Sequence, residues 1–182
     1  MKFRVACLMI CALFVTEIAL AQSTGTKLTP KRTIFNDADS FKNSVSLPKN
    51  VLDVLIASLK DDEHYSDLFV DKSNKELNEY FTAVLVHLSG FNEIDYVVQG
   101  NLPFAGADCG WYWIVRSARS HPEVVLFEST GTLELMRSRT NDYSDIRSVW
   151  QSPNERITRI YHYDGHSYVL AHKYDKDIRP KP

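Results

Sequence analysis

Apolar residues between residues 48 and 60 recur with the spacing of one helical face. Five of them form the stripe: Val51, Leu52, Leu55, Ile56 and Leu59. This spacing is expected of a helix that buries one side. Pro48 suits a first helical turn, where a missing N–H costs nothing, and Ser46 is a candidate capping residue. The pattern predicts a helix over residues 48–60.

A second helix is predicted after an acidic surface turn. Ser73 and Glu76 have the three-residue spacing of a capping box, in which two side chains satisfy backbone N–H groups at a helix start. The helix that opens there carries Leu77 and Tyr80. Residues 81–88 can either continue it or form a buried strand. We favour the strand because aliphatic and β-branched residues follow one another there.

The second half of the chain has the alternation of short strands. Runs rich in β-branched and aromatic residues are separated by Gly, Asn, Asp, Ser or Pro, which interrupt strands. The runs span residues 95–99, 111–116, 123–128, 132–137, 145–150, 156–163 and 167–173. Their close spacing predicts an antiparallel meander.

Asp164-Gly165 gives the strongest hairpin signal in the meander, because a two-residue turn with positive φ favours Asp-Gly. Such a turn pairs Tyr163 with His166 and Tyr161 with Tyr168. In that register the three tyrosines share one face of the sheet with Leu170.

Helices precede strands along the chain, which favours the α+β class over an alternating α/β fold. We expect N-terminal helices packed on a C-terminal antiparallel meander sheet of about six to eight strands. A single α+β domain over residues 41–176 would contain all of them. Residues 177–182 would form a tail.

The start of the chain has the three parts of a secretory signal peptide. Lys2 and Arg4 precede an almost wholly apolar run, which ends in the small-x-small sequence Ala19-Leu20-Ala21. We therefore expect residues 1–21 to be removed on export, to the periplasm or beyond the cell. Residues 22–40 are expected to be a flexible leader, since they offer little to bury. After cleavage we expect no membrane span.

Charge and cysteine content exclude several classes of function. Among the 182 residues no basic run exceeds Lys31-Arg32, whereas nucleic-acid binding needs clustered basic side chains. Cys7 and Cys11 fall inside the predicted signal, which leaves Cys109 without an intramolecular disulfide partner. No pattern indicates a cofactor.

Residues 88–98 resemble the repeat of FG-GAP and VCBS-type extracellular proteins. In Leu88-Ser89-Gly90-Phe91-Asn92-Glu93-Ile94-Asp95-Tyr96-Val97-Val98, a Gly-containing loop leads into an Asp-aromatic-aliphatic strand. Residues 140–146 repeat the loop, Asp and strand order. The resemblance implies a calcium loop, for which Asn141, Asp142 and Asp145 are the candidate ligands. Most acids of the first loop are missing, although Ca²⁺ needs about 6 to 8 oxygen ligands.

The segment around Cys109 is the least ordinary of the exported chain. Gly106 and Gly110 bracket Asp108 and Cys109, and His166 follows much later. The order is similar to that of papain-like cell-wall endopeptidases, which implies Cys109 as nucleophile and His166 as base. Those enzymes place the cysteine at a helix start, whereas a strand is predicted here. The alternative is that Cys109 is a small buried side chain in a tight loop.

Aromatic side chains give a further candidate site. Trp111, Trp113, Tyr161 and Tyr163 can form a platform for a protein or carbohydrate ligand, or they can belong to the core. We expect a non-enzymatic exported binding or interaction domain. A cysteine-dependent wall hydrolase and a calcium-stabilised FG-GAP-like module are the alternatives.

Overall fold

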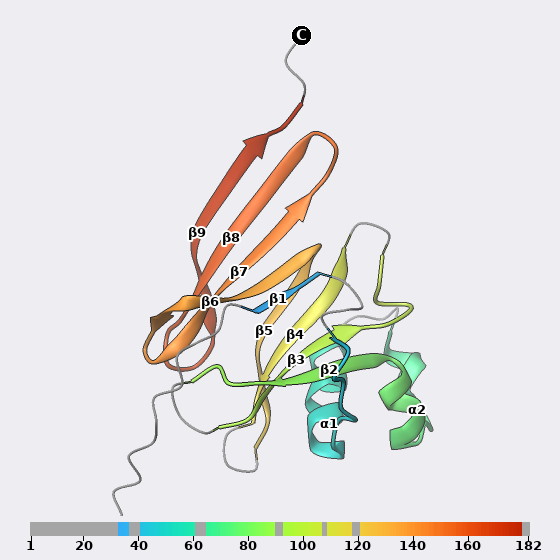
Figure 1. The fold of residues 1–182 in the computed structure, drawn as a ribbon. Coiled ribbons are helices and arrows are strands. Elements are labelled where there is room, and N and C mark those ends of the chain that lie inside the picture. Colours follow the sequence, from blue (N-terminus) through green and yellow to red (C-terminus); the bar gives the residue numbers. More distant parts are fainter. Residues whose placement is uncertain are drawn as a thin grey trace, which may run out of the picture.

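Two antiparallel sheets make up most of the described chain (Figure 1). The computed structural model describes residues 33–36, 41–60, 65–89, 93–106, 109–117 and 121–179. The strands are β1 (Thr33–Phe35), β2 (Phe81–Val86), β3 (Asp95–Gly100), β4 (Gly110–Arg116), β5 (Glu123–Thr130), β6 (Thr132–Thr140), β7 (Tyr143–Gln151), β8 (Glu155–Tyr163) and β9 (Tyr168–Asp177). Each of the seven predicted runs is a strand, and residues 81–86 are strand as favoured.

The helices are short. They are α1 (Lys49–Ser58), the 3-10 turn η2 (Ser66–Phe69) and α2 (Asn74–Glu79). The capping box is confirmed: the Ser73 hydroxyl accepts the Glu76 N–H, and the Glu76 carboxylate accepts the Ser73 N–H at 2.8 Å. Pro48 itself occupies the capping position of α1, without a side-chain cap bond.

Strand order follows the chain within each sheet. One sheet is β2-β3-β4-β5, and the other is β1-β6-β7-β8-β9. Gly131 alone separates β5 from β6, and there the chain leaves one sheet and enters the other. The buried Thr130 hydroxyl donates to the Thr132 carbonyl at this corner, at 3.2 Å.

The four-stranded sheet is buried on both faces. One face packs against the five-stranded sheet through a core that includes Val97, Tyr112, Ile114, Leu133, Ile146 and Tyr163. The other face contributes Val98, Trp113 and Val115 to a second core, which α1 joins through Val51, Leu52 and Leu55. Burial on both faces explains the continuous apolar run at residues 111–115.

The predicted α+β architecture is wrong. Strands account for 54% of the structure and helices for 15%. Among the described residues, α1 is the one helix of seven or more residues. The helical pattern at residue 73 ends after six residues because strand-forming residues begin at Phe81. A single meander sheet is also wrong, since the corner at Gly131 divides the strands between two sheets.

The predicted hairpin register is wrong by two residues. Tyr163 pairs with Tyr168, and Asp164 to Ser167 form a four-residue turn. The Asp164 carboxylate accepts the N–H groups of Ser167 (2.9 Å) and His166 (2.8 Å), which lowers its pKa. This side-chain bonding stabilises the longer turn. The three tyrosines nevertheless share one buried face.

Part of the predicted leader belongs to the sheet. Residues 33–35 form β1, which pairs with β6 and buries Phe35. Residues 1–32, which include the predicted signal peptide, lie outside the described residues. At the other end, β9 continues to Asp177, one residue into the predicted tail.

Candidate functional site

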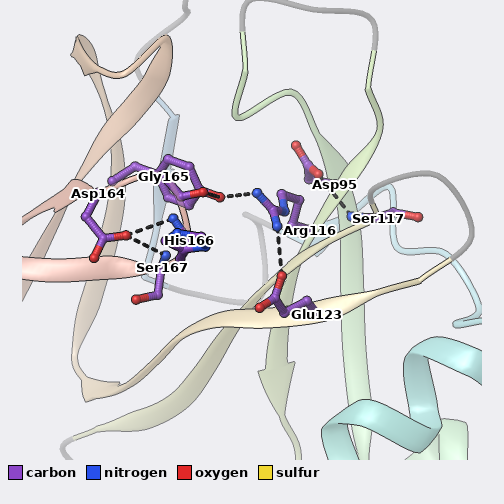
Figure 2. A network of polar contacts seen from close by, with 9 residues as sticks. Asp95, Arg116, Ser117, Glu123, Asp164, Gly165, His166 and Ser167 are labelled. Atoms are coloured by element: carbon purple, nitrogen blue, oxygen red, sulfur yellow. Dashed lines mark hydrogen bonds and ion pairs between the residues drawn. The ribbon is translucent and has the colours of Figure 1, made fainter.

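Cys109 and His166 lie at opposite ends of β4. Cys109 directly precedes the strand, where its half-buried sulfur accepts the Ser129 hydroxyl at 3.4 Å. His166 belongs to the turn that lies beside Arg116, the last residue of β4 (Figure 2). A strand of this length spans about 20 Å. The two side chains are therefore not brought together as nucleophile and base.

The loop at Cys109 is closed by its own backbone. The Gly106 N–H donates to the Cys109 carbonyl at 2.8 Å, and Ala105 bridges to Gly110. Cys109 therefore ends a tight loop directly before β4 and does not begin a helix. Asp108 lies outside the described residues.

The proposed calcium ligands shape a hairpin turn. Asn141 and Asp142 both have positive φ (52° and 66°) between β6 and β7, as in a type I′ turn. The Asn141 amide donates to the Tyr163 carbonyl at 2.7 Å, and Asp145 accepts the Thr140 hydroxyl at 2.7 Å. Within the described residues no group of three His, Cys, Asp or Glu side chains could hold a metal ion.

The four candidate platform rings do not share a surface. Trp113 is fully buried, and its indole N–H donates to the Ser58 hydroxyl of α1 at 3.2 Å. Trp111 is half-buried and packs edge-on against Trp113. Tyr161 and Tyr163 belong to the core between the sheets. These aromatic side chains therefore stabilise the fold.

Arg116 links the two sheets through side-chain contacts (Figure 2). Its guanidinium donates to the Tyr163 hydroxyl on β8 and to Glu123 on β5, the latter at 2.8 Å. Nearby, the buried Asp95 accepts the Leu88 and Ser117 N–H groups, each at 3.2 Å. Burial raises the pKa of Asp95. These contacts hold loops and strands together.

Glu128 makes a second link between the sheets. Its side chain is only 11% exposed. It accepts the Tyr161 hydroxyl at 2.6 Å, an Arg159 N–H at 2.7 Å and the Ser148 hydroxyl at 3.1 Å. Burial, followed by the bond to Glu128, raises the pKa of Tyr161. Three side chains of β7 and β8 are thus fixed to one carboxylate of β5.

A small cavity of about 350 Å³ lies beside α1. Its lining consists of Ile56, Leu59, Lys60, Phe69 and Val70. An apolar wall with a single ammonium contains no acid–base pair and no nucleophile. The cavity therefore offers no catalytic group set.

The outer edge of β9 is a long, open strand edge. β9 lies at the end of its sheet, pairs with β8, and is exposed at every residue after Tyr168. Figure 1 shows the far ends of β7, β8 and β9 extending away from the helices and the other sheet. Among the described residues no strand pairs with the other side of β9. Its outward N–H and C=O groups can accept another strand.

The exposed side chains of β9 are partly apolar. Val169, Leu170 and Tyr174 are 44%, 52% and 55% exposed. Lys173 and Asp175 lie on one face and form an ion pair at 3.0 Å. Sequence reasoning ended this strand at Lys173 and did not select these residues.

Comparisons with family models, curated proteins and solved structures found no match to this chain. Within the described residues no helix is both long and apolar enough to cross a membrane. The geometry of the chain itself therefore has to support any functional conclusion.

Proposed function

We propose that this chain is an exported, non-enzymatic interaction domain that binds extended polypeptide through the outer edge of β9. The observation that carries the proposal is the strand of 10 residues at a sheet edge, exposed at every residue but the first. An exposed edge binds a peptide by continuing the hydrogen-bonded ladder of the sheet, while side-chain contacts give specificity.

The other candidate groups support this choice because they are far apart, buried in the cores or hydrogen-bonded within the protein. Cys109 and His166 are separated by the length of β4, and Trp113, Tyr161 and Tyr163 are in the cores. The described carboxylates of Asp95 and Glu128 are held by protein donors. The outer edge of β9, by contrast, is paired with no described strand.

Export rests on the sequence of residues 1–21. Its test is the intact mass of the protein recovered from outside the cytoplasm of its natural host. We expect a chain that begins at Gln22. A mass that retains residues 1–21, or protein found only in the cytoplasm, would contradict export and leave edge binding to be judged separately.

Edge binding can be tested with extended peptides selected from a random display library on the exported chain, residues 22–182. Hydrogen exchange then maps where each selected peptide binds. We expect slowed exchange at amides of residues 168–177, with little change in β3 and β4. Peptides that protect other elements and leave β9 unaffected would refute the proposed site.

A further inference from the structure

We propose that β9 also pairs with β9 of a second copy, antiparallel, with Tyr174 opposite Tyr174. The inference rests on the proposed function, because it names a partner for the same edge. A two-fold axis perpendicular to the sheet relates the copies and keeps equivalent side chains on the same face. The two five-stranded sheets then form one continuous sheet.

The charges of β9 fit this register. Lys173 and Asp175 flank Tyr174 and share the opposite face of the strand. When Tyr174 opposes itself, Lys173 of each copy opposes Asp175 of the other. Four charges then alternate in sign across the axis. Opposite charges placed directly across an antiparallel pair stabilise it.

Neighbouring registers fit less well. Moving the axis by one residue toward the start of β9 opposes Lys173 to itself. Moving it one residue the other way opposes Asp175 to itself, although Lys173 of each copy then faces Asp177 of the other. Like charges directly opposite each other are unfavourable. Charged side chains on an edge commonly prevent any pairing. Of these three alignments, only the one centred on Tyr174 opposes neither Lys173 nor Asp175 to itself.

The shape of the molecule leaves room for the second copy. The pairing uses residues 171–177, which lie in the part of β9 that extends away from the helices (Figure 1). Because the strands run in opposite directions, the bodies of the two copies lie at opposite ends of the joined ribbon. The half-exposed Tyr174 rings meet on the axis, where an aromatic cross-strand pair is favourable.

The test uses two charge variants of the exported chain, residues 22–182, namely Lys173→Glu and Asp175→Lys. The first makes both positions acidic and the second makes both basic, so each variant opposes like charges in a homodimer. Sedimentation equilibrium should show self-association weakened about tenfold or more in each. An equimolar mixture should regain the wild-type association, because each acidic position then opposes a basic one.

Matched controls lie on the neighbouring strand. Arg156→Glu and Glu155→Lys make the same charge changes on β8, at exposed positions away from the outer edge of β9. These controls should self-associate like the wild type. If self-association weakens equally in the controls, the net charge of the chain causes the effect, and the proposed register is overturned.

The outcomes separate this inference from the proposed function. A wild-type chain that stays monomeric at millimolar concentration, or a mixture that fails to associate, refutes self-pairing. If selected peptides still protect β9 in that case, edge binding itself stands. If self-pairing is correct, a peptide that protects β9 should also dissociate the dimer, since both use one edge.

Discussion

Replacing Glu128 by alanine should lower the free energy of unfolding by about 3–5 kcal/mol, the usual cost of breaking a buried ion pair. The change removes the acceptor of Arg159, Tyr161 and Ser148. The Tyr161 hydroxyl becomes a buried donor without its partner, which by itself costs about 1–3 kcal/mol. The Arg159 side chain is 27% exposed, so water can replace part of the hydrogen bonding that its guanidinium loses.

Urea unfolding followed by tryptophan fluorescence measures this change, since Trp113 is fully buried in the folded chain. With a slope of about 2 kcal/mol per molar urea, the midpoint should fall by about 2 M. Glu123→Ala is the matched control. It also breaks an arginine pair, but the Glu123 side chain is 54% exposed. Its cost should be about 0–1 kcal/mol.

The reasoning is refuted if Glu128→Ala shifts the midpoint no further than Glu123→Ala. A double variant tests whether the carboxylate acts through the arginine. Glu128→Gln combined with Arg159→Gln should cost less than the two single changes added together, because each single change leaves one charge unpaired. Strict additivity would show that the ion pair of Glu128 and Arg159 contributes nothing.

Three further outcomes are expected. Burial raises the pKa of Tyr161 and Tyr168 above the ordinary 10.0. The folded chain then keeps protons that the unfolded chain releases, so the free energy of unfolding falls as pH rises above about 10. Tyr168→Phe should flatten that decline in urea titrations at alkaline pH. Gly100→Ala places a Cβ 2.4 Å from the Cβ of Phe104, and the resulting overpacking should cost about 1–3 kcal/mol, seen as a lower Tm. Cys109→Ser should change stability by less than about 1 kcal/mol and leave peptide binding intact; lost binding would indicate a role for the thiol.

Local patterns predicted the elements of this fold well. The Ser73–Glu76 capping box and the strand at residues 81–86 depend on neighbours within a few residues, and the sequence records those neighbours directly. The pairing of β1 with β6 joins residues 33–35 to residues 133–135. A three-residue strand carries too little periodicity for such a distant partner to be predicted.

The division of the strands into two sheets could not be predicted from the sequence, for a different reason. Ser129-Thr130-Gly131-Thr132 reads as an ordinary hairpin turn between two strands, yet β5 and β6 enter different sheets there. The distinction depends on which faces become buried: the run at residues 111–115 is covered on both sides. A sequence pattern shows that a strand is apolar on both faces, but it does not show what covers each face.

Several residues that the sequence analysis selected as candidate site residues have structural roles in the fold. Cys109 closes a loop, Trp113 fills a core, and Asn141 forms a turn. Lys173 and Asp175 are common surface residues, and the role that we propose for them depends on the outer edge of β9, which no described strand pairs. That edge is a property of strand order, which depends on the whole topology.

The edge strands β1, β2 and β9 differ in how they avoid pairing with other strands. β1 is only three residues long, and Val45 bridges to Ala83 on the outer side of β2. Short or covered edges of this kind resist association. β9 is long, exposed and carries opposite charges two residues apart. Protection alone would be best served by charges of one sign, which repel in every register. Charges of both signs repel in some registers and attract in others, which favours recognition over protection at this edge.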